Sequence, residues 1–126
     1  MLVAAGTLAV SFLLPAAHDL AVESGTGAPN AATSAALRHQ VPDLAGARVA
    51  SDAQPRSSTY LCYETSAHYY GLAPLAAADA DRQLRTYRIR FVLRWGTTPP
   101  PSYLVGAALV YSEPGRGLSV YRLPAA

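Results

Sequence analysis

The residues of this chain with the clearest chemical potential are arginines in its second half. All ten basic residues are arginine, and half of them fall within residues 82–95, which read RQLRTYRIRFVLRW. These are Arg82, Arg85, Arg88, Arg90 and Arg94. A guanidinium group binds phosphates and carboxylates through paired hydrogen bonds. The segment is therefore a candidate binding surface for a protein partner or for nucleic acid.

The spacing of these arginines predicts a two-faced β-strand over residues 86–95. Odd positions hold Tyr, Ile, Phe, Leu and Trp, whereas even positions hold Arg88, Arg90 and Arg94. Because successive side chains of a strand point to opposite faces, one face should pack on a core and the other should meet water or a partner. Nucleic-acid binding needs cations and aromatic rings on the same surface. The opposed faces therefore favour a protein partner over nucleic acid.

Other reactive side chains are scattered along the chain. Arg116 lies between two glycines in the turn segment SEPGRG and is a sixth candidate for partner binding. Cys62 and His68 are six residues apart, which is about 20 Å along a strand and too far for a thiolate–imidazole pair. The other histidines, His18 and His39, lack metal-binding spacing, and a single cysteine excludes a multi-thiolate zinc site. We therefore expect no catalytic site, no metal and no cofactor.

Aromatic residues are concentrated after residue 58, which predicts a sheet in that half. Strands are expected over residues 59–65, 86–95, 103–111 and 118–123, and the first of them can continue to residue 71. The SEPGRG turn joins the last two strands into a β-hairpin. The three prolines at 99–101 predict a stiff connector, and the alanine-rich segment 72–80 predicts a helical turn.

The N-terminal part of the chain allows two interpretations. Residues 8–14 alternate in a pattern typical of a strand, but the apolar run within residues 1–17 also fits a signal peptide or anchor. Residues 24–58 are rich in small and turn-forming residues, and we expect only a short helix there, over 35–40. This region should be an extended arm or a spacer.

These patterns predict a mainly β fold, a small antiparallel sandwich or barrel-like sheet with at most one or two short helices. The expected division is an N-terminal strand or arm and loop-rich segment over residues 1–58, followed by an antiparallel β domain over residues 59–126.

Composition narrows the function classes. Charged residues make up 14% of the chain and hydrophobic residues 51%, whereas an average chain has about 25% charged residues. The excess apolar surface must lie in a core, a membrane or a neighbouring subunit. Because no catalytic constellation is present, we expect a non-enzymatic structural or assembly protein that binds other protein subunits in a homo- or hetero-oligomer.

A virion component fits this expectation best, such as a phage capsid decoration, head–tail connector or tail protein. The first alternative is an exported bacterial envelope or secretion-apparatus protein, which would touch a membrane if residues 1–17 act as an anchor. The second alternative is a nucleic-acid-binding module that uses the arginine strand.

Overall fold

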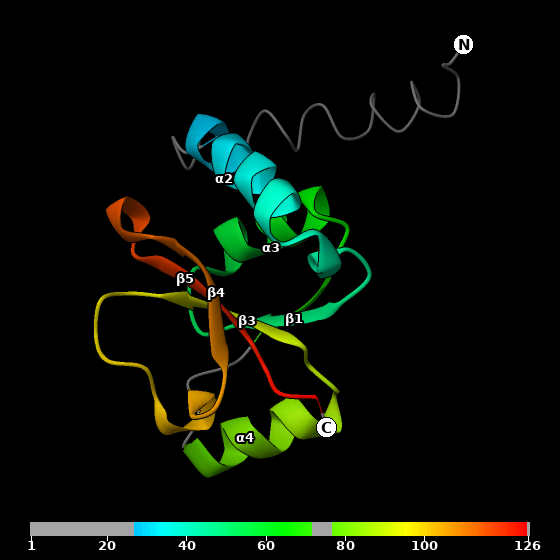
Figure 1. The fold of residues 1–126 in the computed structure, drawn as a ribbon, viewed down its shortest axis with the longest axis vertical. Helices are drawn as coiled ribbons and strands as arrows, with labels where there is room; N and C mark the ends of the chain where they lie inside the picture. The colour runs from blue at the N-terminus through cyan, green and yellow to red at the C-terminus, as the bar shows by residue number, and fades with distance from the viewer. Residues whose placement is uncertain (1–26, 72–76, 126) are drawn as a thin grey trace.

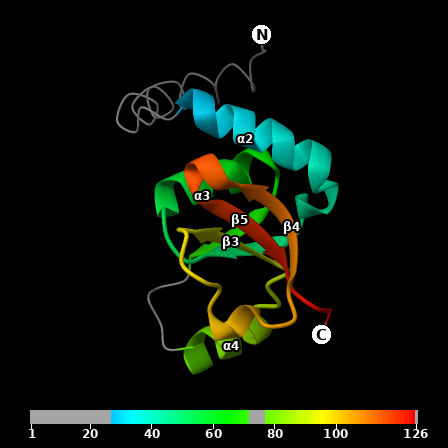
Figure 2. The ribbon, with the colours of Figure 1, turned by 60° about the vertical axis from the view of Figure 1, so that its left-hand side comes forward.

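The computed structural model describes residues 27–71 and 77–125, and in these residues a single five-stranded sheet has the strand order β2-β1-β3-β5-β4. Helices cover both faces of the sheet (Figure 1, Figure 2). The strands are β1 (Arg48–Ser51), β2 (His68–Gly71), β3 (Phe91–Trp95), β4 (Ala108–Glu113) and β5 (Leu118–Arg122). The helices are α2 (Gly27–Gln40), α3 (Pro55–Glu64) and α4 (Ala77–Thr86), with 3-10 turns η1 (Pro42–Leu44), η2 (Ser102–Leu104) and η3 (Pro114–Arg116).

The sheet is mixed. Strand β1 pairs in parallel with β2 on one side and β3 on the other, whereas β5 pairs antiparallel with β3 and β4. The chain runs β1-α3-β2-α4-β3, so its two crossovers pass in opposite directions across the sheet. Because parallel crossovers are almost always right-handed, helices on opposite-going crossovers lie on opposite faces. Accordingly, α3 lies with α2 on one face and α4 lies on the other (Figure 2).

Each face of the sheet has its own hydrophobic core. The core under α2 and α3 contains Leu37, Leu61, Val49, Phe91 and Val120, among others. The core under α4 contains Leu84, Ile89, Ala50, Val92 and Leu104. Neighbouring residues of β3, such as Phe91 and Val92, therefore point into different cores. This strand is buried on both faces, as is usual for strands in the parallel part of a sheet.

The strand expected over residues 59–65 is wrong, because these residues belong mostly to helix α3. The buried residues of α3 are Ser58, Leu61 and Cys62, and Thr65 at the C-cap is also buried, so the buried positions recur every three to four residues on one helix face. Pro55 occupies the first turn, where its missing N–H would have no partner in any case. Aromatic content suggested a strand here, but the burial pattern is helical.

The two-faced strand expected over residues 86–95 is also wrong in its first half. Thr86 ends α4, and the chain then turns through Tyr87 and Arg88, which has a φ of 55°. The N–H of Ile89 donates to Leu84 O at 2.9 Å, and the N–H of Arg88 donates to Arg85 O at 3.1 Å. This is a Schellman helix end with arginine where glycine is usual. Only Phe91–Trp95 is a strand.

The C-terminal β-hairpin is confirmed. Strands β4 and β5 pair antiparallel, and η3 with Gly117 forms the turn between them. The first hairpin strand begins later than expected, because Ser102–Leu104 forms a 3-10 turn before Ala108.

Of the expected fold class, the structure confirms only that the chain contains a β-sheet. The sheet is mixed rather than antiparallel, helices cover both of its faces, and the described residues show neither a sandwich nor a barrel. The segment 24–58, expected to have little regular structure, contains α2, β1 and the start of α3. Strand β1 lies between β2 and β3 in the sheet. The expectations for residues 1–17, including the strand over 8–14, lie outside the described residues, as does part of the turn expected over 72–80.

Candidate functional site

The structure separates the six candidate arginines into four environments. Arg82 and Arg85 lie on α4 and form ion pairs with Asp79, at 2.8 Å, and with Asp81. Both pairs are solvent-exposed and span one helical turn. Such pairs contribute only a few tenths of a kcal/mol, roughly 0.3–0.5. We assign these two arginines to the solvated side of the helix.

Arg94 is buried at the carboxyl end of β3. Its guanidinium donates three hydrogen bonds to the loop that follows, to Thr98 O at 2.9 Å, Thr98 Oγ1 at 2.7 Å and Pro99 O at 3.0 Å. Its Nε lies 3.7 Å from Asp52 Oδ2. Arg94 therefore anchors a loop rather than presenting a charge to a partner, contrary to its expected place on an exposed face.

Asp52 follows β1 directly, so it meets Arg94 where the carboxyl ends of two parallel strands lie side by side. Its Oδ1 accepts a hydrogen bond from the N–H of Trp95 at 2.9 Å. Burial raises the pKa of Asp52 above the ordinary 3.8, against the opposing effects of the Trp95 N–H and the Arg94 charge. Burial, together with the charge of Asp52, also raises the pKa of Tyr103. The chain leaves β1 toward β2 and leaves β3 toward the opposite side of the sheet, so a switch point lies between these two strands, where ligands of open α/β sheets bind.

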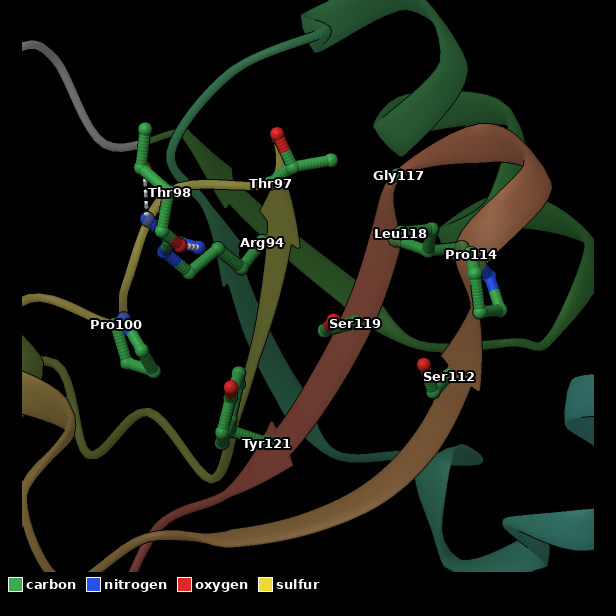
Figure 3. Close-up of a pocket in the computed structure, with 11 residues that line it drawn as sticks. Arg94, Thr97, Thr98, Pro100, Ser112, Pro114, Gly117, Leu118, Ser119 and Tyr121 are labelled. Carbon is green, nitrogen blue, oxygen red and sulfur yellow. Dashed lines mark hydrogen bonds between the residues drawn. The ribbon is translucent and has the colours of Figure 1, made fainter.

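A shallow pocket of about 220 Å³ lies beside Arg94, between the loop after β3 and the β4–β5 hairpin (Figure 3). Arg94, Ser119 and Ser112 are neighbours across the three strands and share one face of the sheet. Thr97, Thr98, Pro100 and Tyr121 also line the pocket. Five of the eleven lining residues carry a hydroxyl group, and the lining contains no histidine, cysteine or carboxylate that could activate a nucleophile.

Arg116 belongs to a network that fastens the hairpin tip to α2. Its Nη1 donates to Thr33 Oγ1 at 3.0 Å, and Thr33 Oγ1 donates to Glu113 Oε1 at 2.8 Å. Its guanidinium carbon lies 5.4 Å from the centre of the Trp95 ring. Tyr111 OH also donates to Glu113 at 2.7 Å. Arg116 thus holds two elements together, whereas the sequence suggested an exposed turn residue.

Arg88 and Arg90 come together with residues that the sequence analysis did not select. Arg48 lies beside them, since the N–H of Arg90 donates to Arg48 O at 2.8 Å. Arg48 Nη1 donates to Tyr87 O at 3.0 Å. All three arginines and Tyr87 are exposed. Arg48 could not be found from spacing, because it is about forty residues away and reaches this place only through the pairing of β1 with β3.

Cys62 and His68 do not form a reactive pair. Cys62 is buried in α3, and burial raises the pKa of its thiol to about 12. The thiol is therefore protonated at neutral pH and is a poor nucleophile. His68 is exposed at the start of β2. Within the described residues, no group of three or more His, Cys, Asp or Glu side chains could hold a metal ion.

The outer edge of the sheet carries exposed apolar side chains. Val105 is 81% exposed and Leu109 is 55% exposed. Leu109 lies on β4, which pairs only with β5 among the described strands. Both residues fall in the strand expected over residues 103–111, but Val105 lies in the segment between η2 and β4, and only the sheet order shows that Leu109 belongs to an edge strand.

Comparisons with protein-family models, with curated proteins and with solved structures found no match to this chain. Among the residues that the structure describes, no helix is long and apolar enough to cross a membrane.

Proposed function

We propose that this protein is a non-enzymatic assembly subunit, and that two copies associate through the edge of β4 that pairs with no other described strand. The observation that carries this proposal is the exposure of Val105 and Leu109 beside that edge, 81% and 55% respectively. An exposed edge presents unpaired N–H and C=O groups, to which a strand of another chain can bind. Because one edge strand can pair with its own copy about a two-fold axis, a single surface is sufficient.

The edge has few of the features that prevent such pairing. Natural proteins protect edges with charges, prolines, bulges or covering elements. The only charged residue of β4 is Glu113, and its carboxylate is engaged by Thr33 and Tyr111. A register shift between Leu109 and Tyr111 interrupts the ladder, but the residues before it are apolar. Leu109 pairs with Tyr121 of β5, so the apolar strip continues from the edge onto the face of the sheet.

This proposal moves the expected interface from the arginines to an apolar edge. Arg94 and Arg116 are engaged inside the fold, so they support an interface only indirectly, by holding the loop and hairpin beside it. The wider setting expected from the sequence, a virion or another macromolecular assembly, stays a proposal. Detection of the chain in purified particles would test it.

Sedimentation velocity of the full chain over a hundredfold range of concentration tests the association. We expect a reversible dimer that Leu109→Lys weakens at least about tenfold, because burial of a leucine contributes about 1.5–3 kcal/mol. Tyr63→Lys is the matched control, since Tyr63 is 69% exposed on α3, away from the edge. A wild-type chain that stays monomeric throughout, or equal weakening by both variants, would contradict the proposal.

A further inference from the structure

A second surface lies where α4 ends and where β1 and β3 begin (Figure 1). We call it the basic–aromatic surface and define it by Arg48, Tyr70, Tyr87, Arg88 and Arg90. Arg48 bridges the two segments, since its backbone O accepts from the N–H of Arg90 and its Nη1 donates to Tyr87 O. This surface is independent of the β4 edge and of the proposed assembly function.

The three arginines of this surface are not neutralised by neighbouring carboxylates within residues 27–71 and 77–125. The acidic residues described there form ion pairs with other arginines or, in the case of Glu113, hydrogen bonds with Thr33 and Tyr111. Arg48, Arg88 and Arg90 are exposed, and His68 is the register partner of Arg48 on β2. The surface is therefore locally cationic although the net charge of the chain is only +2.

An exposed aromatic ring lies on the same surface. Tyr87 is 46% exposed, and its ring stacks on Tyr70 with centroids 5.6 Å apart and an interplanar angle of 29°. Tyr70 holds one side of the ring, so the ring is already ordered before any ligand binds. A nucleobase can stack on an exposed ring of this kind, whereas the negatively polarised face of the ring does not attract a carboxylate.

The backbone at Arg88 fixes this arrangement. Its φ of 55° lies in the left-handed region, which glycine adopts at no steric cost and arginine adopts with strain. The Schellman helix end that requires this conformation also places Tyr87 and Arg88 next to each other at the surface. Tyr87 and the arginines share this surface because residues 86–90 do not form the strand that was expected to separate aromatic residues from arginines.

We propose that the basic–aromatic surface binds single-stranded nucleic acid, with the three arginines contacting phosphates and Tyr87 stacking on a base. Guanidinium groups bind phosphate oxygens in paired hydrogen bonds, and stacking on aromatic rings tolerates any base. The binding should therefore depend on salt and show little sequence preference.

Fluorescence anisotropy with a labelled oligothymidylate and the full chain tests this inference. The double variant Arg88→Gln with Arg90→Gln should raise Kd at least about tenfold. It should also reduce the slope of log K against log salt by about 1.4, since each neutralised phosphate of a single strand contributes about 0.7. The matched control is Arg82→Gln with Arg85→Gln, which makes the same change in net charge. Because those two arginines are already paired with aspartates, Kd should change less than about threefold.

Two single variants distinguish the effect of base stacking, and any effect of misfolding, from the effect of charge on binding. Tyr87→Leu should raise Kd about tenfold and leave the salt slope unchanged, because it removes the ring without removing a charge. Arg88→Gly should raise Tm while weakening binding, because glycine relieves the left-handed strain as the charge is lost. That combination excludes unfolding as the cause of weak binding.

Several outcomes would overturn the inference. They are no binding by the wild-type chain at low salt, equal loss in both double variants, and unchanged binding in Tyr87→Leu. Equal displacement of the oligonucleotide by polyglutamate would assign the surface to an acidic polypeptide instead. Leu109→Lys should bind the oligonucleotide like the wild type, so failure of the β4-edge proposal can be distinguished from failure of this one.

Discussion

Arg94 and Asp52 form an ion pair in which Nε lies 3.7 Å from Oδ2, beyond hydrogen-bond distance. Each group instead has its own anchor. The other two nitrogens of Arg94 bind the loop after β3, and Oδ1 of Asp52 accepts from the N–H of Trp95. The pair therefore joins the ends of β1 and β3 through two separately fixed groups, and its members should respond differently to substitution.

The hydrogen bond from Trp95 N–H should account for most of the stabilising effect of Asp52. Asp52→Asn keeps an acceptor at Oδ1 and should change the free energy of unfolding by less than about 1 kcal/mol, whereas Asp52→Ala leaves a part-buried N–H unpaired and should cost about 1–3 kcal/mol. Urea unfolding measures both. Asp81→Ala is the control, because it removes an exposed pair with Arg85 and should cost less than about 0.5 kcal/mol. Equal destabilisation by Asp52→Asn and Asp52→Ala would contradict the assignment of the stabilising effect to the Trp95 hydrogen bond.

The raised pKa of Asp52 predicts a pH dependence of stability with a defined sign. Burial lifts this pKa above the unfolded value of about 3.8, so the folded state binds the proton more tightly. Asp52 therefore contributes stability that is present below the unfolded pKa and is lost as pH rises through the folded pKa. The free energy of unfolding of the wild type minus that of Asp52→Asn should fall as pH rises across this window and then level off. A difference that rises with pH would show that the Trp95 N–H and the Arg94 charge together outweigh the effect of burial on this pKa.

Thr33 should be the residue on which the docking of α2 depends most. Its hydroxyl is buried, donates to Glu113 and accepts from Arg116. Thr33→Val keeps the shape but removes the acceptor of Arg116 Nη1 and one of the two hydrogen bonds to Glu113 Oε1, so it should cost about 1–3 kcal/mol in free energy of unfolding. Hydrogen exchange should show the loss of protection in α2. Thr59→Val is the matched control on the exposed side of α3 and should cost less than about 0.5 kcal/mol. If Thr59→Val destabilised the protein as much as Thr33→Val, the docking of α2 would not depend specifically on Thr33.

Cys62 should be inert in the folded protein. With a pKa of about 12, only about 0.01% of the thiol is ionised at pH 8, and the side chain is 3% exposed. Dithionitrobenzoate should therefore label less than one thiol per ten chains in native buffer and one per chain in urea. Rapid labelling of the native protein would mean that α3 opens readily or that the thiol is activated.

Local sequence patterns predicted the hairpin and part of α2. They did not predict the elements that are stabilised by residues far away in the sequence. The SEPGRG turn specifies the β4–β5 hairpin because its residues define the turn conformation without outside help. The C-terminal half of α2 was expected because Pro42 ends it. Its N-terminal half was missed because the buried face there carries Asn30, Thr33 and Ser34, which resemble loop residues in a sequence. The hydroxyl groups of Thr33 and Ser34 find partners only in the folded chain, since Thr33 Oγ1 donates to Glu113 Oε1 and Ser34 Oγ donates to Asn30 O.

The sequence by itself determined that the chain carries ten arginines and no lysine, and that the SEPGRG turn joins two strands into a hairpin. Only the tertiary structure decided which arginines are available to a partner. Arg94 and Arg90 lie four residues apart in one segment, yet the first anchors a buried loop and the second is exposed beside Arg48. The difference arises from the pairing of β1 with β3, a contact between residues about forty positions apart. Because such parallel pairing leaves no local periodicity, the environment of each charge is set by the completed sheet and not by spacing along the chain.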